Sequence, residues 1–140
     1  MKTNKKIYFT GAITGGRIAQ PQYVEIVKIL GQYGTVFSKH VADESLGEYG
    51  ETDLTKEEIH DRELERLNQS DLVVAEVTTS SLGVGYLISQ AINAHKKVIA
   101  LYNGEDDFKL TAMIRGDKNV RVRLYKTPED LIAILNSEVS

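Results

Sequence analysis

The sequence contains no cysteine and no tryptophan, and only 2 of its 140 residues are proline. The lack of cysteine excludes a disulfide framework, a thiolate zinc site and a thiol nucleophile, and it fits a reducing compartment. No apolar run approaches the roughly 20 residues that a membrane-spanning helix needs. The basic start, MKTNKK, leads into a short strand-like segment instead of an apolar signal region. We therefore expect a cytoplasmic protein that does not bind a membrane.

Neither sign of charge dominates the chain, which has 17 basic and 20 acidic residues and a formal net charge of -3. This balance argues against the broad basic surface that nucleic acid requires, although one small anion could still be held locally. A chain of 140 residues with 41% hydrophobic residues can bury a core of its own. We expect a single domain over residues 1–140.

Short apolar runs alternate with segments of helical pattern. Runs at residues 6–10, 35–38, 72–77, 97–102 and 120–124 predict five strands. A helix is predicted from Pro21 to the glycines at 31 and 34, and its apolar pattern consists of Val24, Ile26, Val27, Ile29 and Leu30. Further helices are predicted from Thr55, which forms a capping box with Glu58, to about Ser70, over 83–94 and from Pro128 onward. An acidic, glycine-containing surface loop is expected over 42–54 and a short turn over 111–114. This alternation predicts an α/β protein with a parallel sheet, whose ligands lie beyond the carboxyl ends of the strands.

Two glycine-containing segments follow predicted strands. The first, GAITGGR over residues 11–17, could let backbone N–H groups approach an anion. A glycine turn that only joins a strand to a helix fits this segment equally well. The second, TTSSLGVGY over 78–86, offers Ser80 or Ser81 as a helix cap, as a phosphate ligand, or one serine for each role.

The predicted helix after Thr55 carries several charges, most of which suit a solvated face. Glu63 differs, because it lies one turn after Ile59 and one turn before Leu67 and so could point towards the sheet. An inward carboxylate is a functional candidate. The histidines at positions 40, 60 and 95 lack metal-ligand spacing, and a structural role is favoured for each of them.

Together, KIYFTGAITGGR, YGTVFSKHV, IHDRELERLNQSDLVVAEVTTSSLGVGY and LTAMIRG follow one order and spacing. With them, the sequence resembles the 2′-deoxynucleoside 5′-monophosphate N-glycosidases of the nucleoside 2-deoxyribosyltransferase family, over nearly its whole length. The resemblance implies a flavodoxin-like (Rossmann-like) three-layer fold with a five-stranded parallel sheet. It also implies a homodimer that cleaves the bond between base and deoxyribose in a nucleoside 5′-monophosphate, without a metal or an organic cofactor.

The resemblance also implies roles for individual residues. Tyr8 would lie beside the catalytic carboxylates, His40 near the base, and Thr111 would reach the phosphate of the neighbouring subunit. The family's catalytic positions are Glu63, Tyr8 and Leu87. The implied substrate contacts are Gly11, Ile13, Thr14, Gly15, Gly16, Arg17, Tyr23, His40, Ser81, Gly83, Thr111 and Met113.

The sequence departs from the family at three positions. The family's nucleophilic Glu is Leu87 here, its partner Asp is Glu63, and a phosphate-binding Arg is Thr14. Leucine cannot attack the anomeric carbon as a carboxylate does in a retaining glycosidase. Glu76 is not interpreted as a relocated nucleophile, because the family also has a Glu there. Three functions stay open: an N-glycosidase that uses Glu63, a nucleotide-binding pseudoenzyme, and a nucleoside 2-deoxyribosyltransferase.

Overall fold

Five parallel strands form one sheet in the order β2-β1-β3-β4-β5. The computed structural model describes residues 4–13, 20–37 and 53–139. The strands are β1 (Lys5–Gly11), β2 (Gly34–Phe37), β3 (Leu72–Glu76), β4 (Lys97–Asn103) and β5 (Val120–Tyr125). This order is that of flavodoxin-like proteins, so the predicted fold class is confirmed.

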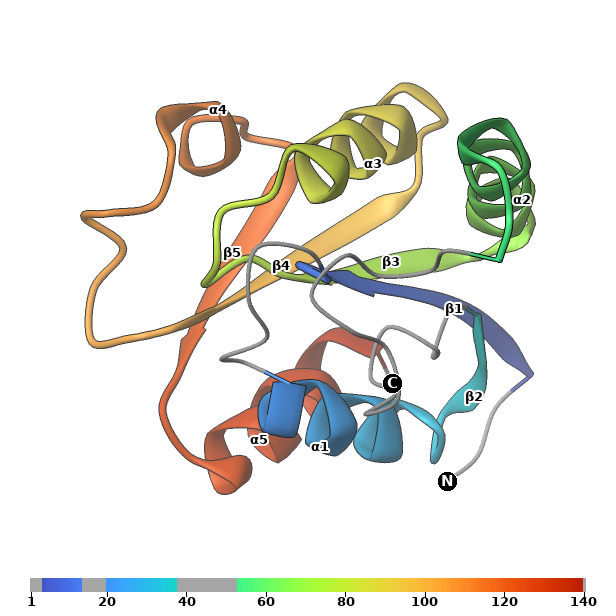
Figure 1. Ribbon diagram of the computed structural model, residues 1–140. Coiled ribbons are helices and arrows are strands. Elements are labelled where there is room, and N and C mark those ends of the chain that lie inside the picture. Colours follow the sequence, from blue (N-terminus) through green and yellow to red (C-terminus); the bar gives the residue numbers. More distant parts are fainter. Residues whose placement is uncertain (1–3, 14–19, 38–52, 140) are drawn as a thin grey trace.

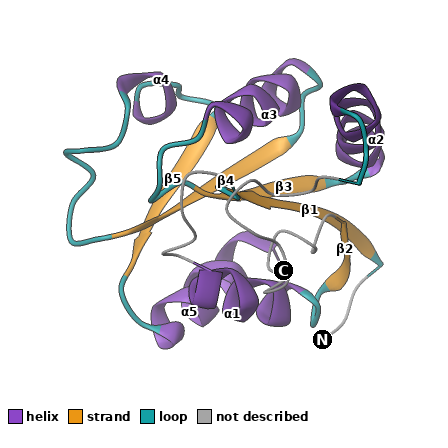
Figure 2. Cartoon of the chain, viewed as in Figure 1, coloured by secondary structure: helices purple, strands orange, loops and turns teal. Residues whose placement is uncertain are grey.

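Helices cover both faces of the sheet (Figure 1). They are α1 (Gln20–Leu30), α2 (Lys56–Gln69), α3 (Leu82–Asn93), α4 (Ala112–Arg115) and α5 (Pro128–Val139). Helices α1 and α5 lie on one face, and α2, α3 and α4 lie on the other, which makes three layers (Figure 2). Within the part of the chain that the structure describes, no helix is both long and apolar enough to cross a membrane.

The alternation of side chains along the strands divides the core into two apolar clusters. Ile7 and Phe9 of β1 pack in the cluster that faces α1 and α5. Tyr8, between them in sequence, belongs to the opposite cluster with Leu67 of α2 and Ile88 of α3. All five residues of β3 are buried, as expected for a central parallel strand. The alternation therefore directs the Tyr8 side chain towards the layer of α2 and α3.

Two details of the expected first helix are wrong. Gly34 does not end the helix but begins β2, where a Cβ atom would lie 2.0 Å from the Lys5 carbonyl oxygen. Only glycine allows this close approach of β2 to β1. Val24, expected on the apolar face, is 43% exposed. The helix buries Tyr23, Ile26 and Leu30 instead, a spacing that turns Val24 outward.

A buried carboxylate fastens the last helix to the sheet. Glu138 of α5 is 3% exposed, and its oxygens accept from Arg121 Nε at 2.7 Å and from Arg123 Nη1 at 2.6 Å. Lys97 Nζ lies 3.4 Å from the same carboxylate. Burial alone raises the pKa of Glu138, but the hydrogen bonds from Arg121 and Arg123 outweigh it and lower this pKa below its ordinary value.

We expect Glu138→Gln to lower the free energy of unfolding at pH 7 by about 1–2 kcal/mol, because charge-assisted hydrogen bonds to half-exposed arginines are lost. Because the pKa of Glu138 is lower in the folded state than in the unfolded state, its charged form stabilises the fold. This contribution is complete above the unfolded-state pKa of about 4.3 and is lost as pH falls through the folded-state pKa. Urea unfolding should therefore show the difference shrinking below about pH 4. Glu129→Gln, an exposed change on the same helix, is the control. An equal effect of the two variants would contradict the prediction.

Candidate active site

A tyrosine and a glutamate meet between β1 and α2. The Tyr8 hydroxyl donates to Glu63 Oε1 at 2.6 Å, and Tyr8 itself is 1% exposed. Arg62 Nε lies 2.7 Å, and Arg66 Nη1 3.4 Å, from Glu63 Oε2. The inward direction that the spacing predicted for Glu63 is confirmed. A phenol and two guanidinium groups thus hold this carboxylate in one place, which suits stabilisation of a nearby positive charge.

Leu87 lies on α3, on the apolar side of this arrangement. It is partly buried and packs against the cluster that contains Tyr8, Leu67 and Val84. The resemblance assigns this position to the family's nucleophile, and that assignment stays a prediction. A leucine side chain can pack against a sugar but cannot form or stabilise a glycosyl intermediate.

A histidine and a tyrosine bridge α2 and α3. His60 Nε2 lies 2.9 Å from Tyr86 Oη, and His60 Nδ1 lies 2.9 Å from Asp61 Oδ1. The two rings are 5.6 Å apart. Sequence reasoning gave His60 only a structural role. The spacing of His60 and Glu63, three residues apart on one helix, was the available signal that both belong to the same face.

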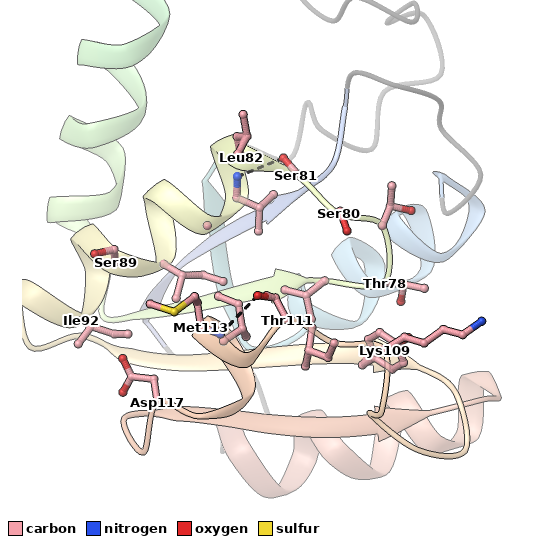
Figure 3. Close-up of a pocket in the computed structure, with 18 of the residues that line it drawn as sticks. Thr78, Ser80, Ser81, Leu82, Ser89, Ile92, Lys109, Thr111, Met113 and Asp117 are labelled. Atoms are coloured by element: carbon pink, nitrogen blue, oxygen red, sulfur yellow. Dashed lines mark hydrogen bonds between the residues drawn. The ribbon is translucent and has the colours of Figure 1, made fainter.

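Ser81 begins α3 as its N-cap, and its Oγ accepts from the Val84 N–H at 3.2 Å. The expected capping role is confirmed, and Ser80 lies beside it. Close by is a pocket of about 780 Å³ between α3 and α4 (Figure 3). Thr78, Ser80, Ser81, Lys109 and Thr111 contribute polar atoms to its lining. Thr111 caps α4 by accepting from the Met113 N–H at 3.4 Å.

The structure separates the predicted site residues into two groups on either side of α3. Ser81, Thr111 and Met113 line the pocket on the α4 side. The Tyr8–Glu63 pair lies on the α2 side, where Tyr86 also contacts α2. Gly83, exposed in the first turn of α3, is outside the pocket lining. The predicted contacts at Thr14, Gly15, Gly16, Arg17 and His40, and the acidic loop up to residue 52, lie outside the described residues.

Gly11 ends β1 directly above Tyr23. A Cβ atom at Gly11 would lie 2.7 Å from Tyr23 Cζ, so only glycine fits this close approach. Tyr23 is 1% exposed and packs edge-on against Phe9, with ring centroids 5.8 Å apart. Ile13 packs against the same cluster. Tyr23 thus packs against the end of β1. The substrate contacts of Gly11, Ile13 and Tyr23 stay predictions.

A buried acid joins the ends of three strands beneath the pocket. Glu76 is 0% exposed and accepts from the Thr78 N–H at 2.8 Å, the Thr78 hydroxyl at 2.7 Å and the Tyr125 hydroxyl at 2.5 Å. The Thr78 hydroxyl in turn accepts from the Asn103 N–H at 2.9 Å. Burial raises the pKa of Glu76, and the hydrogen bonds from Tyr125 and Thr78 only partly offset this. Burial and the adjacent Glu76 raise the pKa of Tyr125 well above its ordinary value.

The strand order and the two groups of polar residues at the carboxyl ends of the strands define a flavodoxin-like α/β protein with a candidate ligand site on its α3 face. Among the described residues, no group of three or more histidine, aspartate or glutamate side chains could hold a metal ion. Residues 7–131 match the nucleoside 2-deoxyribosyltransferase family, and the chain belongs to that family.

Relatives at about 45% identity are named as nucleotide N-hydrolases. The chain is 46% identical over 110 residues to the 5-hydroxymethyl-dUMP N-hydrolase of Danio rerio, covering 79% of this chain and 77% of that protein. It is 44% identical over 111 residues to the 5-hydroxymethyl-dUMP N-hydrolase of Homo sapiens, covering 79% of this chain and 64% of that protein. Among solved structures, a CMP N-glycosidase of Clostridium botulinum superposes with a TM-score of 0.67 at 16% identity, covering 95% of this chain and 98% of that one. The predicted resemblance to nucleotide N-glycosidases is confirmed.

Proposed function

We propose that the chain binds 2′-deoxynucleoside 5′-monophosphates and slowly hydrolyses the bond between base and sugar, with Glu63 beside the anomeric carbon. The hydrogen bond of 2.6 Å between Tyr8 and Glu63 carries this proposal, because it fixes a carboxylate at the position where the family has its partner acid. The names of relatives at about 45% identity support the same substrate class.

Slow turnover follows from the surroundings of Glu63. Departure of the base leaves positive charge on the sugar, which a fixed carboxylate stabilises. Glu63 can also orient water as a general base. Leu87, however, provides no nucleophile, and Arg62 and Arg66 already hold Glu63 Oε2 in ion pairs.

The hydrolytic part of the proposal is tested by base release from a panel of nucleoside and deoxynucleoside monophosphates at high protein concentration. Glu63→Gln should lower the rate by about tenfold or more, because the charge beside the sugar is lost. Glu65→Gln, an exposed change two residues further along α2, is the matched control and should leave the rate unchanged. Equal rates for the two variants would remove Glu63 from the chemistry.

For the phosphate, we propose ligands at the start of α3 and in the glycine segment. Ser81 and the first N–H groups of a helix of 12 residues form a typical anion site. The remaining proposed ligands are the backbone N–H groups of Gly15 and Gly16, the Arg17 side chain, and Thr111 of a second copy of the chain.

Ser81→Ala should weaken binding of a nucleoside monophosphate by about tenfold and leave binding of the matching nucleoside unchanged, because one charge-assisted hydrogen bond is lost. Ser81→Asp separates this effect from capping: aspartate still caps α3 but repels the phosphate, so it should bind nucleotide less well than Ser81→Ala. Ser89→Ala changes an exposed serine further along the same pocket and is the control. Calorimetry with both ligands measures all three, and equal affinities for nucleotide and nucleoside would contradict the phosphate site.

A second candidate function is nucleotide binding without hydrolysis. It is favoured by Leu87, which packs against the apolar cluster that contains Tyr8, and by the two arginines paired with Glu63. Nucleotide binding without base release from any substrate in the panel would support it. The third alternative, a nucleoside 2-deoxyribosyltransferase, requires transfer of the sugar to an added free base, which the same assay detects.

We also propose a homodimer, a single domain over residues 1–140 and a cytoplasmic location. Large exposed apolar side chains support the dimer. Leu82 and Met113, which line the pocket, are 97% and 81% exposed, and Phe108 in the loop before α4 is 91% exposed. The cysteine-free composition supports the location. Light scattering that gives the mass of one chain at high concentration would contradict the dimer and the shared role of Thr111.

A further inference from the structure

Three hydrogen-bonded side chains, one of them next to Leu87 in the sequence, take no part in the proposed function. Tyr86 directly precedes Leu87 on α3, and its hydroxyl lies 2.9 Å from His60 Nε2. The other ring nitrogen, His60 Nδ1, lies 2.9 Å from Asp61 Oδ1. The order is carboxylate, imidazole and hydroxyl, each within hydrogen-bond distance of the next.

This arrangement has the parts of an activated nucleophile. Asp61 at Nδ1 favours the imidazole tautomer with its proton there, which leaves Nε2 free to accept from the Tyr86 hydroxyl. Tyr86 is 46% exposed, so a ligand can reach this residue. A buried structural pair would offer no such access.

The location of Asp61, His60 and Tyr86 also suits a nucleophile for the proposed reaction. His60 and Glu63 lie three residues apart on α2 and so share one face of that helix. The phenol that is bonded to His60 therefore lies on the same side of α3 as the fixed carboxylate, and Tyr86 directly precedes Leu87 in the sequence. A tyrosine suits an anionic substrate, because a neutral phenol does not repel the phosphate as a second carboxylate would. Tyrosine nucleophiles are known among glycosidases.

We infer that Tyr86, with His60 as its base and Asp61 orienting that base, is the nucleophile for base–sugar cleavage in this chain. The inference rests on the proposed function. In the first step the Tyr86 oxygen bonds to the anomeric carbon as the bond to the base breaks. The electron pair leaves with the base, and the phenol proton passes to His60 and through solvent to the base.

In the second step water attacks the anomeric carbon and the bond to the Tyr86 oxygen breaks. The electron pair returns to that oxygen, which regains a proton as the water loses one through His60. The sum is nucleotide plus water to free base plus deoxyribose 5-phosphate, with the phenol restored. Glu63 stabilises the positive charge on the sugar in both steps.

The test compares the wild-type chain with Tyr86→Phe and His60→Gln, using 5-hydroxymethyl-dUMP and dUMP as substrates. Tyr86→Phe keeps the ring, and the glutamine keeps a hydrogen-bond acceptor but cannot take up a proton. Each should lower base release by about 100-fold while the calorimetric affinity for the nucleotide changes less than about twofold. His95→Asn is the histidine control, because His95 is exposed and has a positive φ of 60°, which asparagine tolerates.

Two further measurements separate the possible outcomes. The intact mass of acid-quenched wild-type protein should show a deoxyribose 5-phosphate adduct, and digestion should place this adduct on the peptide with Tyr86. Tyr86→Phe should show no adduct. The double variant Leu87→Glu with Tyr86→Phe should regain base release, because a carboxylate replaces the phenol, which also shows that Tyr86→Phe folds. Wild-type turnover that Tyr86→Phe leaves unchanged overturns the inference and leaves the proposed function with Glu63. Nucleotide binding without wild-type turnover overturns the inference together with the hydrolytic part of the proposal.

Discussion

Replacing Leu87 with glutamate is expected to raise the rate of base release by about 1000-fold over the wild type, the scale on which a nucleophile contributes to catalysis. Tyr8 and Glu63 are already hydrogen-bonded at 2.6 Å, and Leu87 packs against the cluster that contains Tyr8, so we expect a new carboxylate to find its partners in place. Arg62 and Arg66, both paired with Glu63, provide positive charge that favours a second anion.

The new carboxylate and Glu63 would repel each other, so the two should titrate as a coupled pair, with one proton held to higher pH. The variant should also lose about 1–2 kcal/mol of stability, because Leu87 now packs against the cluster around Tyr8 and a half-buried charge would replace it.

Leu87→Gln is the matched control, since it has the size and polarity of glutamate but is not a nucleophile. Base release from a deoxynucleoside monophosphate is measured for the wild type, Leu87→Glu, Leu87→Gln and Leu87→Glu with Glu63→Ala. If Leu87→Glu binds nucleotide but releases base no faster than Leu87→Gln, the site differs from its relatives by more than one residue. If none of the four proteins releases base while all bind nucleotide, nucleotide binding alone is the better account.

The sequence was sufficient for the fold because its signals are local. Apolar runs such as LVVAEV predict buried strands, and the capping box at Thr55 and Glu58 predicted the start of α2, which both reciprocal hydrogen bonds confirm. The spacing of Ile59, Glu63 and Leu67 was enough to predict that the Glu63 carboxylate points towards the sheet. Gly34 was misplaced, because only the pairing with Lys5 on β1 shows that the close approach belongs to a strand.

The contacts that join distant segments could not be predicted in the same way. His60 and Tyr86 are 26 residues apart, and their bond depends on how α2 and α3 lie side by side. The basic residues at 121 and 123 alternate along β5, but nothing local indicates that both pair with Glu138 of α5. The division of the site residues between the two sides of α3 likewise depends on how the helices pack. Short sequence motifs carry no information on that packing.

Truncating Glu76 to alanine is expected to cost about 3–5 kcal/mol of unfolding free energy, the largest stability effect expected here. The change leaves three donor groups without their acceptor, namely the Thr78 N–H, the Thr78 hydroxyl and the Tyr125 hydroxyl, and it creates a cavity in a fully buried place. Because Thr78 lines the pocket and is bonded to Asn103, nucleotide affinity should also fall. Tyr125→Phe removes one donor only and should cost about 1–2 kcal/mol.

The pH dependence of stability distinguishes the charge of Glu76 from its packing. Burial raises the folded-state pKa of Glu76, so the folded protein binds this proton more tightly than the unfolded chain does. Glutamates in an unfolded chain titrate near pH 4.3 on average. The contribution of this proton to stability is therefore complete below about pH 4.3 and is lost as pH rises through the raised folded-state value. Glu76→Gln, which cannot titrate, should therefore lose this decrease while keeping most of the packing. Urea unfolding of the wild type, Glu76→Gln and Glu76→Ala between pH 4 and pH 8 measures it. Parallel pH profiles for the wild type and Glu76→Gln would contradict the raised pKa, because they would mean that Glu76 titrates alike in the folded and unfolded chains.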